Sequence, residues 1–219
     1  MFMIYELDVS PNILAQFERL SVEGEKTNMT DLSIIEEQDK IKNIVSHLVD
    51  TNSYFYGNIF NHNNPFTIHS DTSSIKKSIL LVPIKAKENQ KFIVFDQELH
   101  REKELSWIYN VFDDKTQEEL EKMYYHTSSK SRPFDTPEVI GCIDRPISEY
   151  LFQYLPYTRD LYYGLTGWVW DYKPGKALLF PATKLHATGR MTGPKIGCTI
   201  QFTEILSNQQ ILASARNLL

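Results

Sequence analysis

The sequence has little cysteine and no long hydrophobic run. Its only cysteines, Cys142 and Cys198, lie far apart and outside any CxxC or Cys/His cluster, which argues against a disulfide framework or a cysteine-based zinc site. No apolar run approaches the roughly 20 residues that a helix needs to cross a bilayer, and residues 1–9 lack the basic-then-apolar order of a secretory signal. We therefore expect a cytoplasmic protein in which both cysteines are small core residues.

The sequence also lacks an excess of positive charge. It carries 23 Lys and Arg against 28 Asp and Glu, a formal net charge of -5. Because affinity for nucleic acid rests mainly on clustered Lys and Arg, a nucleic-acid partner is disfavoured. The hydrophobic share of 42% and the aromatic share of 12% suffice for a packed core and argue against disorder. We expect a single domain spanning residues 1–219, with peripheral insertions.

Two segments near the start have helical patterns. Ser10 is a candidate helix cap, and a proline follows it at the first helical position before NILAQFERL. In residues 30–49 the apolar side chains recur at mostly helical spacing. We expect residues 1–52 to form an N-terminal helical part whose second helix packs against a sheet.

Short β-branched and aromatic runs replace this pattern from about residue 53. They fill residues 53–96 and 160–204, where clusters of turn residues separate runs such as SILLVPI, KFIVFD and KALLFP; this order is typical of a β-sandwich or barrel. Residues 97–159 instead combine an acidic helical stretch with a Ser/Pro loop. We interpret them as an insert that covers one end of the sheet and shapes a substrate pocket. Residues 205–219 are expected to form a C-terminal helix.

The segment FTIHSD offers the first candidate ligands for a metal. On a strand, His69 and Asp71 are two residues apart and point the same way. An imidazole and a carboxylate placed in this way can hold one ion, although a His-x-acid triplet is also common by chance.

A third candidate ligand follows LLFPATKL near the other end of the chain. His186 lies far from His69 in the sequence, so the two meet only if the last strands return beside the early ones, as closure of a β-barrel requires. Two His and one carboxylate on one side of a metal leave the opposite positions open, which is the arrangement of non-haem iron(II) oxygenases. The alternative for His186 is an ordinary polar residue at the end of a strand.

The strand KIGCTIQF has one polar and one apolar face. Lys195, Gly197, Thr199 and Gln201 share the polar face, while the four residues between and after them are Ile, Cys, Ile and Phe. Because a dry core does not accept such a polar stripe, we expect it to line water or a ligand pocket. A lysine beside a glycine and a threonine hydroxyl suits a bound carboxylate.

Together these motifs resemble the 2-oxoglutarate and iron(II)-dependent oxygenase superfamily, with its HxD…H triad, over roughly residues 53–204. The resemblance implies an all-β core, a cupin-like double-stranded β-helix or jelly-roll, with flanking N- and C-terminal helices and a helical insert, α+β overall. It implies that His69, Asp71 and His186 bind Fe(II) and are the catalytic residues.

The resemblance also implies how the co-substrate is bound. Lys195, where Arg is more usual, would bind the far carboxylate of 2-oxoglutarate. The Ser that is common two residues later is Gly197 here, which leaves Thr199 as the nearest hydroxyl. Lys77 and Arg190 are rivals for the carboxylate.

The reaction implied is oxidation of 2-oxoglutarate to succinate and CO₂ by O₂, coupled to hydroxylation of an unidentified small-molecule or peptide substrate. Asp71 is retained where related halogenases lack the carboxylate, which favours hydroxylation. Two alternatives stay open: a metal-free barrel that binds a sugar or peptide, and a cupin-like metalloenzyme that needs no 2-oxoglutarate.

Residues before the HxD segment have less certain roles. His62, in the Asn-rich FNHNNPF, is interpreted as a solvated turn residue rather than a pocket residue. Three others could reach the co-substrate, but intervening loop residues weaken the argument from strand parity: Tyr54, Tyr56 and Asn58.

Overall fold

The computed structural model describes most of the expected core. It describes residues 4–24, 31–46, 54–62, 68–71, 77–87, 89–100, 139–155, 159–191 and 193–203. The helices expected in the acidic part of the insert and in residues 205–219 lie outside these ranges.

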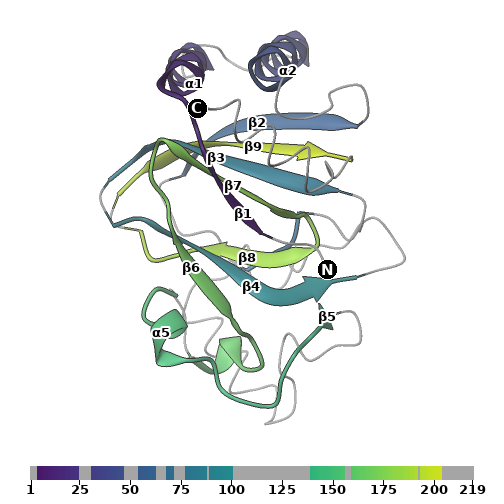
Figure 1. Ribbon diagram of the computed structural model, residues 1–219, viewed down its shortest axis with the longest axis vertical. Helices are drawn as coiled ribbons and strands as arrows, with labels where there is room; N and C mark the ends of the chain where they lie inside the picture. The colour runs from purple at the N-terminus through teal and green to yellow at the C-terminus, as the bar shows by residue number, and fades with distance from the viewer. Residues whose placement is uncertain are drawn as a thin grey trace.

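Two antiparallel sheets face each other, with two helices lying over the first sheet (Figure 1). The first sheet has the order β1 (Tyr5–Asp8), β7 (Lys176–Pro181), β3 (Ser78–Ala86), β9 (Lys195–Phe202) and β2 (Phe55–His62). The second has the order β5 (Val139–Ile140), β4 (Lys91–Leu99) and β6 (Gly167–Asp171), with β8 (Lys184–Thr188) also paired to β4. This architecture confirms the expected jelly-roll core, α+β overall.

The sequence of strand β3 is an unbroken apolar run because both faces of the strand are buried. Ile79 and Leu81 belong to the core between the sheets, whereas Leu80, Val82 and Ile84 belong to the core beneath the helices. Because both faces of this strand are covered, alternation with polar residues is absent.

Helices α1 (Pro11–Gly24) and α2 (Asp31–Val45) cover the outer face of the first sheet. The expected cap is present, since the hydroxyl of Ser10 accepts a hydrogen bond from the Ile13 amide at 3.4 Å. Helix α2 sits close to β2: the Gly57 amide donates to Gln38 Oε1 at 2.6 Å, and a Cβ added to Gly57 would lie 2.7 Å from Ile41. The prediction that the second helix packs on a sheet is confirmed.

The described part of the insert lies differently from the prediction. Helix α5 (Glu149–Phe152) and its neighbours bury Ile147, Leu151 and Leu155 against the face of the second sheet that carries Phe95. This segment therefore packs on the outer face of that sheet, and does not only cover one end.

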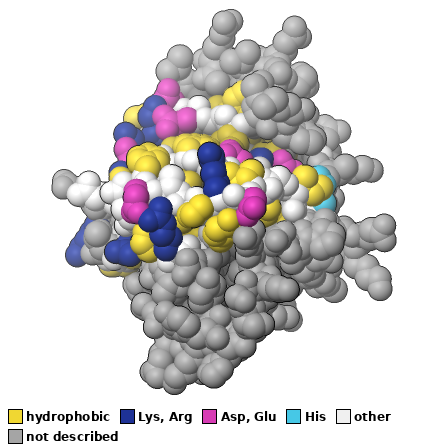
Figure 2. Space-filling model, turned by 90° about the horizontal axis from the view of Figure 1, so that it is seen from below, with side chains coloured by type: hydrophobic (Ala, Val, Ile, Leu, Met, Phe, Trp, Pro, Cys, Tyr) yellow, Lys and Arg dark blue, Asp and Glu magenta, His cyan; other side chains and the backbone are white. Residues whose placement is uncertain are grey.

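Surface charge is mixed on the face of the molecule shown in Figure 2. The described Lys and Arg side chains there are interspersed with Asp, Glu and hydrophobic ones, without a separate basic area. Among the described residues, no helix is both long and apolar enough to span a membrane.

Candidate metal centre

The two histidines far apart in the sequence are directly paired in the structure. The His69 amide donates to the His186 carbonyl at 3.0 Å, and the His186 amide donates to the His69 carbonyl at 2.8 Å. On its other side, His186 pairs with Val94 of β4. Backbone bonds on both sides thus fix β8 between β4 and the HxD segment, and closure of the core brings the predicted ligands together.

Three potential ligand atoms converge at this point. One nitrogen each of His69 and His186 and one oxygen of Asp71 all lie within 4.8 Å of one another. His186 Nε2 is 3.3 Å from Asp71 Oδ2 and His69 Nε2 is 3.9 Å from Asp71 Oδ1. Ligands about 2.1 Å from a shared ion have separations of this size, so the spacing fits a metal.

The hydrogen bond of His186 also fits a metal ligand. Its Nδ1 lies 2.9 Å from the Lys184 carbonyl oxygen, which can only accept, so Nδ1 carries the proton and Nε2 presents its lone pair in the neutral ring. The rings of Phe92 and Phe180 pack around the imidazole, with centroids 5.5 and 5.1 Å away. A lone pair held towards a carboxylate is favourable when a cation lies between them.

The charge of Asp71 responds to the same neighbours. Burial opposes its ionisation, but when the imidazoles are protonated the charge of His186, the hydrogen bond that its Nε2 then donates and the charge of His69 outweigh this effect and lower the pKa of the carboxyl group. Asp71 is thus held as a carboxylate, the form that binds metal.

Lys195 is buried beside this site. Its side chain is 2% exposed, and Nζ lies 4.6 Å from the ring centroid of Tyr172 and 5.8 Å from that of Phe92. Burial lowers the pKa of Lys195 to about 7. Among the described residues, no carboxylate forms an ion pair with it.

A cavity of about 260 Å³ joins the candidate metal ligands to the polar face of β9. His69, Asp71, His186, Lys195 and Thr199 all line it. The structure therefore brings together every residue predicted for metal and co-substrate, and the polar stripe lines a pocket as predicted.

Gly197 interrupts this stripe for a steric reason. A Cβ at this position would lie 2.0 Å from the hydroxyl oxygen of Tyr172 and 2.6 Å from the ring of Phe60. The Tyr172 hydroxyl donates to the Ile196 carbonyl at 3.0 Å, so the tyrosine occupies the space that a side chain at 197 would need.

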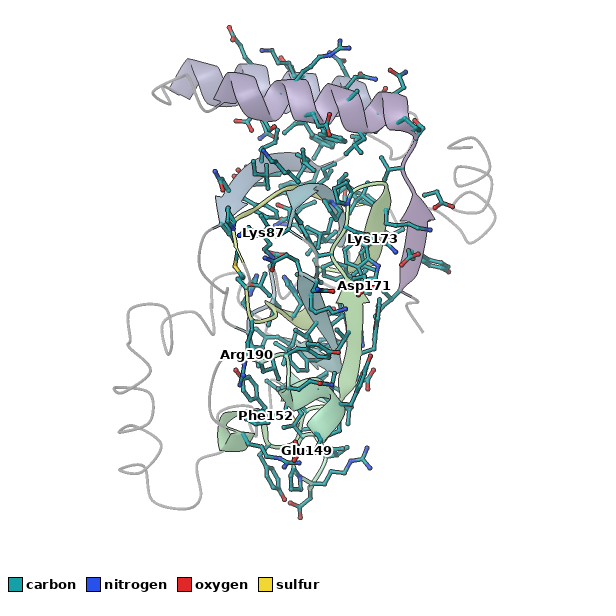
Figure 3. All side chains as sticks on the ribbon, turned by 90° about the vertical axis from the view of Figure 1, so that its left-hand side faces the viewer. Lys87, Glu149, Phe152, Asp171, Lys173 and Arg190 are labelled. Carbon is teal, nitrogen blue, oxygen red and sulfur yellow. The ribbon has the colours of Figure 1, made fainter. Side chains whose placement is uncertain are left out.

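The two rival cations lie elsewhere. Lys77 Nζ sits 4.1 Å above the ring of Tyr54 and does not line the cavity. Arg190 donates from its amide to the Tyr154 carbonyl at 2.6 Å and from Nε to the Leu155 carbonyl at 2.8 Å. Figure 3 shows it at the same end of the molecule as Phe152, remote from α1 and α2. Of the three candidates, only Lys195 faces the pocket.

The interpretation of His62 as a solvated turn residue is wrong. His62 is the last residue of β2, opposite Lys195 in the β2–β9 register, and it lines the cavity. Burial and the charge of Lys195 lower the pKa of His62. Strand β2 runs unbroken through FYGNIFNH, so the parity that places Tyr56 and Asn58 in the pocket extends to residue 62, as the pairing of β2 with β9 shows.

No protein-family model matches the sequence, and no match among curated proteins was found. Among solved structures, an N-substituted L-amino acid dioxygenase from Burkholderia ambifaria AMMD has 12% identity and a TM-score of 0.46 over 90% of this chain and 80% of that one. The non-heme alpha ketoglutarate dependent epimerase SnoN from nogalamycin biosynthesis has 8% identity and a TM-score of 0.48 over 92% and 78%. At this similarity, neither protein assigns a reaction to this chain. What the chain itself has is a two-sheet jelly-roll fold with an HxD…H cluster at its open cavity.

Proposed function

We propose that this protein is an Fe(II)- and 2-oxoglutarate-dependent oxygenase that hydroxylates a substrate C–H bond. The observation that carries the proposal is one cavity lined both by the convergent ligand atoms of His69, Asp71 and His186 and by the buried ammonium of Lys195, which forms no ion pair with any carboxylate in the described ranges. A triad alone would suit many metalloproteins; the cation facing the same space is what favours a dicarboxylate co-substrate.

Each residue has a distinct role in this proposal. His69, Asp71 and His186 hold the iron, which when bound supplies the activation of O₂. Lys195 binds the far carboxylate of 2-oxoglutarate, and Thr199 offers it a hydroxyl on the same face. One oxygen atom of O₂ enters succinate as CO₂ leaves, and the other enters the substrate as a hydroxyl group.

We further propose a single domain and a cytoplasmic location. The first sheet joins strands from both ends of the sequence, β1 and β9, which supports one domain. Cys142 and Cys198 are both free, as is usual in a reducing compartment.

The test is metal binding followed by co-substrate turnover. Under oxygen-free conditions, we expect one Fe(II) per chain in the wild type and loss of uptake in His69→Ala, Asp71→Ala and His186→Ala, because each removes one of three ligands. His100→Ala is the matched control, since His100 lies outside the cavity and pairs with Glu98 at 2.9 Å. Equal iron content in all variants would refute the triad.

Turnover separates the alternatives. We expect slow conversion of 2-oxoglutarate to succinate without added substrate. Iron binding with no affinity for 2-oxoglutarate would instead indicate a cupin-like enzyme that does not use it, and no iron binding would indicate a metal-free binding protein.

A further inference from the structure

The cavity has a polar wall made of paired residues on two adjacent strands. In the β2–β9 register, Tyr56 is opposite Gln201, Asn58 opposite Thr199, and His62 opposite Lys195. All six residues line the cavity. They form a ladder whose titratable groups, His62 and Lys195, lie at one end, while the Tyr56–Gln201 end carries no ionisable acid or base near neutral pH.

The two ends of this ladder are too far apart for one small diacid. Six residues of extended strand separate Lys195 from Gln201, about 20 Å at roughly 3.3 Å per residue. The five carbons of 2-oxoglutarate are joined by four bonds of about 1.5 Å and span at most about 6 Å. A co-substrate anchored on Lys195 therefore leaves the Tyr56–Gln201 end vacant.

The candidate metal ligands line the same cavity as both ends of the ladder. Phe92 is in contact with both Lys195 and His186, which joins the metal site to the Lys195 end. Phe180 also packs against the imidazole of His186, and its β3 partner, Ile79, is the partner of Gln201 as well. The neutral end thus shares the cavity with the metal ligands but is separated along β9 from Lys195, and a second molecule bound there would present a bond for oxidation.

The chemistry of the neutral end is well defined. Tyr56, Asn58 and Gln201 each offer groups that can donate and accept hydrogen bonds, and within the described part of the chain no hydrogen bond engages these side chains. Ile79, Leu81 and Phe180 form the apolar lining behind them. Tyr56 is 44% exposed, so this end opens to solvent. No ionised side chain among the described residues faces it.

We infer that the β2–β9 ladder binds the oxidised substrate, and that this substrate is a neutral, hydroxyl-rich molecule of the polyol or glycoside class. The inference rests on the proposed function for its chemistry, although binding depends only on the ladder. Hydroxyl groups match side chains that both donate and accept, and the C–H face of a sugar ring matches the apolar lining. A charged substrate would find no counterion at this end, and an unpaired charge in a partly dry site is costly.

Three probes that differ at one group test the charge requirement. They are methyl β-glucopyranoside, its uronate and its 6-amino-6-deoxy analogue, which carry a hydroxymethyl group, a carboxylate and an ammonium at the same position. Calorimetric titration into the oxygen-free protein loaded with Fe(II) and 2-oxoglutarate should show that the neutral glycoside binds at least about tenfold more tightly than either charged probe, a difference of about 1.4 kcal/mol.

Variants at Gln201 test the location. Gln201→Leu should lower the affinity for the neutral glycoside by roughly fivefold to tenfold, as expected for the loss of a hydrogen-bonding group. The affinity for 2-oxoglutarate should stay unchanged. Gln201→Glu should shift the preference towards the amino probe. Gln153→Leu is the control, because the amide of Gln153 donates to the Tyr150 carbonyl outside the cavity.

The outcomes separate this inference from the proposed function. Equal binding of the three probes, preference for a charged probe, absence of glycoside binding at any soluble concentration, or indifference to Gln201→Leu would each overturn the inference while leaving iron and 2-oxoglutarate binding intact. Glycoside binding that depends on Gln201 in a protein without iron or 2-oxoglutarate affinity would support the ladder and refute the oxygenase.

Discussion

At the scale of single residues, Lys195 combines burial with a charge that has no partner among the described residues. Its side chain is enclosed by the rings of Phe60, Phe92 and Tyr172, which attract a cation but supply no opposite charge. An arriving carboxylate therefore finds a desolvated cation and not one already paired.

We predict that Lys195→Ala lowers the affinity for 2-oxoglutarate by roughly 30-fold or more, because the loss of one partner of a buried charge pair costs about 2–5 kcal/mol. Iron binding should stay near normal. Lys195→Arg should retain part of the affinity, since the charge persists in a bulkier, forked group. The measurement is titration of 2-oxoglutarate into the oxygen-free iron protein, followed by absorbance.

Lys77→Ala is the control for this experiment, since Lys77 lies on the ring of Tyr54 outside the cavity. Wild-type affinity in Lys195→Ala would mean that another group holds the carboxylate.

The same burial predicts how stability depends on pH. The folded-state pKa of Lys195 is about 7, below its ordinary value of 10.5. Between these values the unfolded chain binds a proton that the folded protein does not, so the free energy of unfolding should rise with pH through this window, by at most about 1.4 kcal/mol per pH unit from this group. Below pH 7 both states are protonated and its contribution is constant.

Urea unfolding of the wild type and Lys195→Met across this window measures the effect. The variant cannot titrate at this position, so its curve should rise less steeply with pH. Parallel curves would show that Lys195 is not desolvated in the folded protein.

Strand parity predicted which residues share a wall of the cavity. Lys195, at the head of a strand with a polar stripe, lines the cavity, whereas Lys77 and Arg190 do not; its role in binding a carboxylate stays a prediction. Sequence reasoning failed for His62, since the sequence does not reveal that β2 continues into an Asn-rich segment until the partner strand β9 is known to pair that far.

At the scale of elements, Gly197 determines how β9 and the residues after β6 fit together. The hydroxyl group of Tyr172 fills the position of the missing side chain and bonds to the neighbouring carbonyl. The glycine is therefore needed for the tyrosine to pack beneath Lys195.

We predict that Gly197→Ala destabilises the protein by about 1–3 kcal/mol, the usual range for overpacking. Tyr172→Phe removes the clashing oxygen, so the double variant Gly197→Ala/Tyr172→Phe should lose less stability than the sum of the two single variants. Thermal or urea unfolding of the four proteins gives the coupling energy, and strict additivity would contradict the contact.

The apolar run of β3 was predictable as a strand. Its burial on both faces was not, because this depends on the two helices and the second sheet, which are formed by other parts of the chain. The position of α5 on the second sheet could not be predicted from the sequence either. The segment SEYLFQYL indicates a short helix, yet only the tertiary contacts show that Leu151 packs on the second sheet.

At the scale of the whole molecule, closure of the core could be inferred because the HxD segment and His186 can share a metal only if the last strands return to the early ones. The pattern of short strands indicated a β-sandwich or barrel, the family resemblance implied a jelly-roll core, and the two facing sheets confirm it. The order of strands within each sheet could not be read from the sequence, since it depends on long-range pairing.

The direct backbone pairing of His69 with His186 determines when, during synthesis and folding, the candidate metal site can form. A ribosome makes the HxD segment long before it makes β8, so the nascent chain has no place for a metal until nearly all of its strands exist. If the cluster binds a metal as proposed, uptake would follow synthesis and long-range closure, and an ion that binds only the closed form would add to its stability by mass action. A bound metal would then indicate that β8 has already paired with the HxD segment.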